Sequence, residues 1–89
     1  MSRADNNQEA IVKALRSVGA TVEITSQQGN GFPDIVCGIF GKNYLIEIKN
    51  LEARGKLLAT QQMFRDKWKG SVDVVTSVDE ALRVIGVKV

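Results

Sequence analysis

The stretch from Gly31 to Lys49 constrains the fold of this chain most strongly. It contains two short runs rich in Val, Ile and Phe, which are separated by Gly41 and Lys42. Two β-prone runs joined by a glycine-containing pair of residues are typical of a β-hairpin. We therefore expect two antiparallel strands, the first opened by Pro33, where a missing N–H costs little.

Three charged residues lie at the open end of this expected hairpin: Asp34, Glu47 and Lys49. With Gly41 and Lys42 in the turn, Asp34 pairs with Lys49, and Glu47 lies diagonally across from Asp34. Side chains on one face start about 5 Å apart when opposed and roughly 7–8 Å apart when diagonal. Because the residues between the charges are nearly all apolar, the pattern predicts two carboxylates that converge on a cation. The plainer alternative is an ion pair of Glu47 with Lys49 that protects an edge strand from aggregation.

Length and composition indicate one small globular domain. The chain has 89 residues, of which 44% are hydrophobic and 25% charged, and this length lies near the lower end of what one core can stabilise. A domain of this size often gains stability from a partner subunit, so we expect a homodimer. The net charge is only +2, so binding to nucleic acid requires Lys and Arg gathered locally.

Several classes of chemistry are excluded by composition. The chain has no histidine, which excludes His-ligated zinc, Ser-His-Asp and Cys-His sites. The single cysteine, Cys37, is expected to be a small buried hydrophobe. No apolar run has the length of a signal peptide core or a membrane span. We therefore expect a cytoplasmic protein without membrane contact.

The remaining patterns predict three helices and two further strands around the hairpin. Ile11 and Leu15 belong to an apolar stripe at helical spacing, and Ser77 with Glu80 forms a capping box. Because both faces of the hairpin are apolar, helices should cover both sides of the sheet. The elements expected besides the hairpin are a helix from Asp5 or Asn6 to about Val18, a strand at residues 21–25, a helix at residues 60–69, a strand at residues 71–75 and a helix at residues 78–85. The helix before the last strand should make the final strand pair parallel, giving a mixed four-stranded α/β sheet.

The charged motif, in this context, resembles a known signature. Pro33-Asp34 followed by Glu47-Ile48-Lys49 is similar to the PD-(D/E)XK nuclease signature. Gly31 and the later Gln61-Gln-Met-Phe64 make the chain resemble the small stand-alone VRR-NUC branch, found in phages and bacteria. The resemblance runs from Glu9 to the last helix. It implies a restriction-endonuclease-like core of order αβββαβ with a C-terminal helix.

The resemblance implies a divalent metal site. Asp34, Glu47 and the backbone carbonyl of Ile48 would hold Mg²⁺ or Mn²⁺, and Lys49 would orient or deprotonate the attacking water. Carboxylate-bound divalent cations suit phosphodiester hydrolysis, because they generate hydroxide and neutralise phosphoryl oxygens.

Two more residues are candidates for the site. The family places a glutamate on its first helix, which points to Glu9. On a helical wheel, however, Glu9 lies beside Val12 at the flank of the apolar stripe, so it is equally well explained as an exposed first-turn acid. Gln61 shares a helix face with Phe64 and Trp68, so its amide should point inward and need a partner. Its alternative role is to cap its own helix. We expect Phe64 and Trp68 to belong to the core.

Other polar residues are candidates for binding DNA. By family analogy, the loop containing Ser26, Gln27 and Gln28 lies beside the scissile phosphate. Phosphate contacts supply affinity without reading sequence, and the basic candidates for them are Lys42, Arg54, Lys56 and Lys67. For each of these taken singly, a solvated surface charge is the simpler interpretation.

These inferences predict a Mg²⁺- or Mn²⁺-dependent DNA endonuclease. Related stand-alone members suggest branched DNA, such as a four-way junction, because a homodimer presents two equivalent sites. The alternative from another class is a non-catalytic DNA-binding or assembly module that retains the nuclease fold. A further alternative is an enzyme acting on RNA or a subunit of a restriction system.

Overall fold

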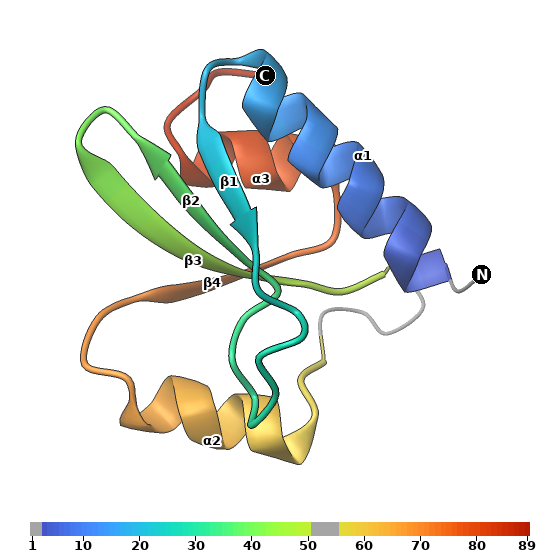
Figure 1. Ribbon diagram of the computed structural model, residues 1–89, viewed down its shortest axis with the longest axis vertical. Coiled ribbons are helices and arrows are strands. Elements are labelled where there is room, and N and C mark those ends of the chain that lie inside the picture. Colours follow the sequence, from blue (N-terminus) through green and yellow to red (C-terminus); the bar gives the residue numbers. More distant parts are fainter. Residues whose placement is uncertain (1–2, 51–55) are drawn as a thin grey trace.

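The computed structural model describes residues 3–50 and 56–89. These ranges contain a mixed sheet of four strands and three helices (Figure 1). In chain order the elements are α1 (Arg3–Ser17), β1 (Thr21–Ile24), β2 (Ile35–Ile39), β3 (Lys42–Ile48), α2 (Ala59–Lys67), β4 (Val72–Val75) and α3 (Val78–Val84). The first helix begins before Asp5, where the sequence had suggested its cap.

The sheet has the strand order β1-β2-β3-β4. The first two pairs are antiparallel, and β3 pairs with β4 in parallel after the chain has passed through α2. This confirms the mixed four-stranded α/β sheet and the order of elements expected from the sequence. No helix in the described ranges is long and apolar enough to cross a membrane.

The hairpin turn differs from the expected one. Ile39 pairs with Lys42, so Phe40 and Gly41 are the turn residues, with φ angles of 54° and 76°. Two positive φ values are the requirement of the type I′ turn, whose twist matches the flanking strands. The predicted pair Gly41-Lys42 was therefore wrong, and each residue of β2 faces a partner two positions earlier in β3 than expected.

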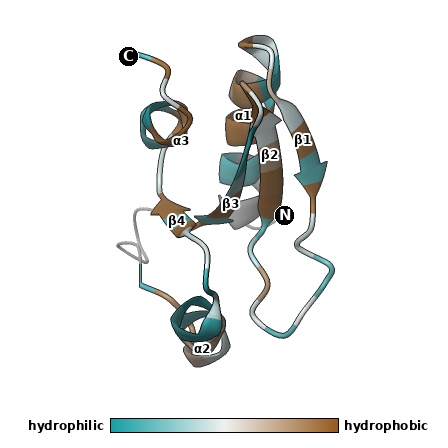
Figure 2. Cartoon of the chain, turned by 90° about the vertical axis from the view of Figure 1, so that its left-hand side faces the viewer, coloured by the Kyte–Doolittle hydropathy of each residue, from teal (hydrophilic) through white to brown (hydrophobic). Residues whose placement is uncertain are grey.

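The hydrophobic core lies on one face of the sheet. α1 and α3 cover this face (Figures 1 and 2). Fully buried residues from β2 and β3, including Ile35, Cys37 and Ile46, pack against Ile11 and Leu15 of α1. Burial raises the pKa of the Cys37 thiol, as expected for a cysteine that serves as a small hydrophobe.

The opposite face of the sheet is less covered than the sequence predicted. Val36 and Leu45 on this face are only half-buried, and α2 has no buried residue. The expectation of helices along both faces was therefore wrong in this respect. At the end of this face that carries Glu47, α2 is joined to the sheet by a hydrogen bond of Gln61.

Candidate active site

Two carboxylates meet at the open end of the β2–β3 hairpin. Asp34 immediately precedes β2, and the pairing of Ile35 with Ile46 places it directly across from Glu47 rather than diagonally. The backbone N–H of Ile48 donates to Asp34 Oδ2 at 2.8 Å. The expected pairing of Asp34 with Lys49 was wrong, because the turn lies one residue earlier in the chain than predicted. The corrected register brings the two acids closer together.

Glu47 is a buried acid whose proton is held tightly. The residue is 3% exposed, and its pKa is raised from 4.5 to about 8. Burial is the main cause, followed by the charge of Asp34 and a hydrogen bond with Asp34, while Lys49 acts in the opposite direction. Two adjacent carboxylates in a poorly solvated place cannot both stay ionised without a nearby positive charge.

Lys49 supplies part of that positive charge. Its Nζ lies 3.6 Å from Glu47 Oε2, and the Lys49 side chain is only 14% exposed. The backbone N–H of Lys49 donates to the Val75 carbonyl at 2.9 Å, so the parallel pairing of β3 with β4 fixes the start of this side chain. One ammonium faces two carboxylates, which leaves the cluster short of positive charge.

Gln61 connects α2 to this cluster. Its Nε2 donates to Glu47 Oε2 at 2.9 Å, and its Oε1 accepts from the backbone N–H of Leu58 at 2.8 Å. The two roles considered from the sequence, capping the helix and joining the site, are thus performed by the two ends of one amide. The helix cap also fixes which end of the amide faces Glu47.

Asn7 is a polar residue near the site that the sequence analysis missed. From α1, its Nδ2 donates to the carbonyl of Lys49 at 3.0 Å and to that of Thr76 at 3.4 Å. The signal was present in the sequence, because Asn7 precedes Ile11 by four residues and so extends the apolar stripe of the helix. A polar group in a core-facing stripe needs a partner.

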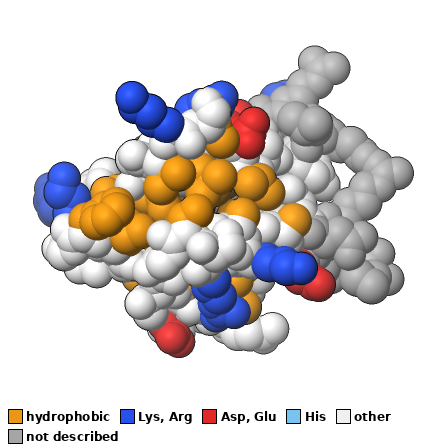
Figure 3. Space-filling view, turned by 90° about the horizontal axis from the view of Figure 1, so that it is seen from above, with side chains coloured by type: hydrophobic (Ala, Val, Ile, Leu, Met, Phe, Trp, Pro, Cys, Tyr) orange, Lys and Arg blue, Asp and Glu red, His pale blue; other side chains and the backbone are white. Residues whose placement is uncertain are grey.

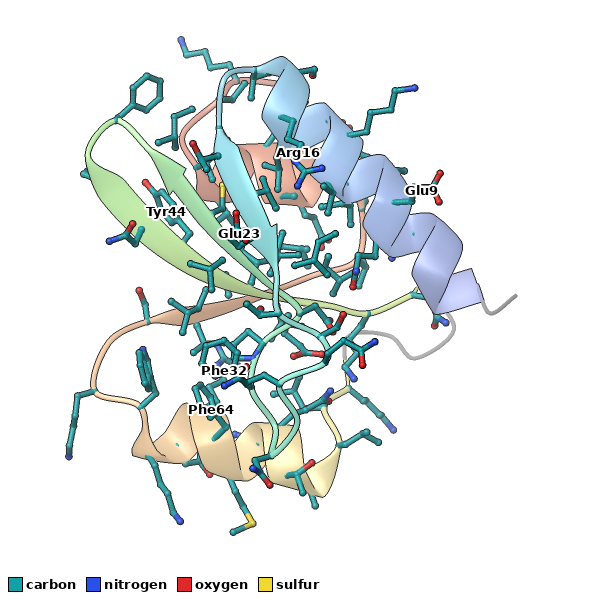
Figure 4. The ribbon with its side chains drawn as sticks, in the orientation of Figure 1. Glu9, Arg16, Glu23, Phe32, Tyr44 and Phe64 are labelled. Atoms are coloured by element: carbon teal, nitrogen blue, oxygen red, sulfur yellow. The ribbon has the colours of Figure 1, made fainter. Side chains whose placement is uncertain are left out.

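Glu9 does not join the two carboxylates. It is exposed, and its side chain points away from the sheet in Figure 4. It borders a groove of α1 together with Val12 and Lys13. This position agrees with the helical wheel, which places Glu9 on the flank of the helix. It does not agree with a role as the glutamate that the family places on its first helix.

The candidate DNA-binding residues are spread over the surface. Ser26 and Gln28 are exposed in the β1–β2 loop, whose base is closed beside the acid pair by the hydrogen bond of Thr25 N–H to the Asp34 carbonyl at 2.7 Å. Lys42 is exposed at the hairpin turn, roughly 17 Å along β2 from Asp34 at the usual rise per strand residue. Lys56 is exposed before α2, and Arg54 lies outside the described residues.

The donor set suits a hard divalent cation. Among the described residues, no group of three or more Asp, Glu, His or Cys side chains is arranged to hold a metal ion. At the hairpin end, the acidic side chains available as ligands are those of Asp34 and Glu47. Mg²⁺ retains most of its waters and binds proteins through one or two carboxylates. The peptide of Ile48 lies beside the pair through its N–H contact with Asp34.

The aromatic residues of α2 are less buried than expected. Phe64 is half-buried and makes an edge-to-face contact with Phe32 of the β1–β2 loop, with ring centroids 5.3 Å apart (Figure 4). Trp68 is 43% exposed, so the expectation that it belongs to the core was wrong. Trp68 follows the last residue of α2, and its ring stacks on Phe64 instead of joining the core cluster.

Comparison with known proteins adds a match of fold. Neither a protein-family model nor a curated protein sequence matches the chain. A solved structure described as a "VRR_NUC domain" matches with a TM-score of 0.70 and 20% identity, covering 96% of both chains. The chain therefore has the fold of a VRR-NUC domain, a nuclease-type fold, over nearly its whole length. This confirms the fold that the sequence motif implied.

Proposed function

We propose that this protein is a metal-dependent nuclease that hydrolyses phosphodiester bonds of DNA. The observation that carries the proposal is the cluster at the hairpin end, where Asp34 and the buried Glu47 face each other with Lys49 and Gln61 around them. A buried acid beside a second carboxylate costs stability, which makes a purely structural reason for the pair a poor one. The VRR-NUC fold supports the same interpretation.

Asp34 and Glu47 would hold Mg²⁺ or Mn²⁺, with the backbone carbonyl of Ile48 completing the site. When bound, such a cation generates hydroxide and stabilises charge on the phosphoryl and leaving oxygens. Gln61 holds the Glu47 carboxylate in one orientation through its Nε2. As an ammonium, Lys49 would bind a phosphate oxygen and orient the attacking water, and only in its uncharged form would it accept a proton from that water; its Nζ lies 3.6 Å from Glu47 Oε2.

We further propose that the enzyme selects branched or otherwise structured DNA and works as a homodimer. A domain of 89 residues commonly gains stability from a second subunit, and a dimer presents two equivalent sites to a symmetric junction.

A non-catalytic role has one observation in its favour. With a pKa of about 8, Glu47 is protonated at neutral pH without a metal. Every buried polar side-chain atom in the described ranges then has a hydrogen-bond partner. A satisfied polar network of this kind could serve structure alone, and the protein would then be a DNA-binding or assembly module.

A cleavage assay distinguishes the nuclease from the non-catalytic module. Labelled four-way-junction, flapped and linear duplex DNA would be incubated with Mg²⁺ or Mn²⁺ and either wild type or Asp34→Asn. The amide can still accept the Ile48 N–H, so the fold should be retained. We expect metal-dependent cutting by wild type, faster on branched DNA, and a loss of at least about 100-fold in the variant. Absence of cutting on every substrate in both metals would refute the nuclease.

A further inference from the structure

A shallow groove lies between α2 and the β1–β2 loop, close to the acid cluster. Its volume of about 280 Å³ is at or just below the roughly 300–1,000 Å³ of pockets for drug-sized ligands. That size suits one planar ring system rather than a larger molecule. The residues that line the groove are Asn30, Thr60, Met63, Phe64, Lys67 and Trp68.

The floor of the groove is a stack of aromatic rings held in a fixed position. The rings of Phe64 and Trp68 are stacked with centroids 5.2 Å apart and planes inclined by 18°. Phe32 holds Phe64 from the loop side. Gly70 leaves space for the indole, because a Cβ there would lie 2.9 Å from Trp68 Nε1. The indole of Trp68 is thus supported on one face by Phe64, and the residue remains 43% exposed.

The groove begins one helical turn from the candidate active site. Gln61, which contacts Glu47, precedes Phe64 by three residues and Trp68 by seven. At the usual helical rise these positions lie about 4.5 Å and about 10 Å further along the axis. A strand whose phosphate is bound at the acid cluster would have a neighbouring nucleotide at this distance.

The charge around the groove suits a polyanion. Residues 56–69 carry four basic side chains and one acidic side chain, and the acid, Asp66, accepts a hydrogen bond from Gln62 Nε2 at 2.8 Å. Lys67 itself lines the groove. In a two-fold dimer built on this surface, the same basic segment would face its own copy. Like charges would then oppose each other, so a nucleic acid is the better occupant than a second copy of the chain.

We propose that this groove binds an unpaired nucleobase, stacked on Trp68, of the DNA strand whose backbone passes the acid cluster. The inference rests on the proposed nuclease function for its choice of ligand. It adds to that function a basis for selecting branched DNA. Bases at a junction, flap or gap are free to stack on an aromatic ring, whereas bases inside a duplex are not.

Because Trp68 is the only tryptophan, its fluorescence reports on the groove directly. The full chain would be titrated, in EDTA so that nothing is cut, with a ten-nucleotide thymidine strand and with an abasic strand of the same length and charge. A stacked base quenches an indole, so the thymidine strand should quench the emission and the abasic strand should not. A duplex of the same length should also leave the emission unchanged.

Affinity for a fluorescein-labelled strand, measured by anisotropy, tests the same contact with variants. Trp68→Ala should weaken binding of the thymidine strand by about 5- to 150-fold, the range found for loss of one stacked base. Trp68→Phe should retain most of the affinity, because a ring remains. The matched control is Phe40→Ala, which removes a residue 77% exposed at the hairpin turn. That turn lies at the end of the molecule opposite α2, the end seen in Figure 3 with its exposed hydrophobic side chains.

Each outcome decides the proposal. Equal binding of the abasic and thymidine strands without quenching would overturn it, because binding would then depend on phosphates alone. A change in sedimentation of Trp68→Ala with unchanged DNA affinity would also overturn it and would assign the surface to a second copy. If quenching depends on the base but the protein never cuts DNA, the proposed base-binding groove would be supported and the proposed nuclease activity would be refuted.

Discussion

Replacing Glu47 by glutamine should stabilise the metal-free protein at alkaline pH. An amide has the shape of the protonated acid, and it can donate to Asp34 while it accepts from Gln61 Nε2. At low pH the variant and wild type are therefore nearly equivalent. They differ at high pH, where wild type must ionise a residue that is 3% exposed beside another carboxylate.

The magnitude follows from the pKa of Glu47. The value is 4.5 for an unperturbed group and about 8 in the folded protein. Below pH 4.5 the acid is protonated in both the folded and the unfolded state, so it contributes no difference. As the pH rises to 8, the unfolded state loses its proton first and wild type loses stability. At about 1.4 kcal/mol for each tenfold difference in proton affinity, ionised Glu47 costs the fold about 3–5 kcal/mol.

Thermal unfolding in EDTA at pH 5 and pH 8.5 measures this cost. For a domain of this size, 1 kcal/mol shifts the Tm by about 4–8 °C. Glu47→Gln should therefore exceed wild type by more than about 10 °C at pH 8.5 and by much less at pH 5. Glu23→Gln is the matched control, because it makes the same substitution at an exposed position of the same sheet. A Tm difference for Glu47→Gln that is equal at the two pH values would refute the reasoning.

Three further predictions concern how the site is supported. Gly31→Ala should lower the Tm far more than Gly29→Ala. Both glycines have positive φ, but only at Gly31 would a Cβ collide with the Thr60 carbonyl, so equal losses would contradict the close packing of loop and helix. Gln61→Ala should reduce metal-dependent cleavage about 10- to 100-fold, as is usual when a side chain that orients a metal ligand is lost, and an unchanged rate would contradict that role. Asn7→Ala should lower the free energy of unfolding in urea by about 1–3 kcal/mol, since it leaves part-buried carbonyls unpaired; no change would show that water replaces the amide.

The sequence predicted the faces of the hairpin correctly even though the register was wrong. Side chains alternate with a period of two, so an error of two positions leaves each residue on its proper face. Asp34 and Glu47 were therefore placed on one side of the sheet. Their direct opposition could not be predicted, because the turn uses Phe40 at a φ of 54°, a conformation that is unfavourable for a bulky residue.

The parts of the site that depend on contacts between distant elements were harder to predict. Gln61 was identified because a polar residue on an inward helix face needs a partner. Asn7 carried the same signal and was missed, since its partners are backbone carbonyls more than 40 residues away. Trp68 was assigned to the core on helical spacing alone. Spacing shows which residues share a face of α2, but not how deeply that face is buried.

The central claim is that Asp34 and Glu47 together bind a divalent cation. The most direct test is a crystal structure grown with Mn²⁺ above pH 8, where Glu47 is ionised, with data collected for anomalous scattering. We expect one anomalous peak within about 2.0–2.4 Å of carboxylate oxygens from both residues, and none there in Asp34→Asn. Manganese bound elsewhere, with no anomalous peak beside Asp34 and Glu47, would contradict it.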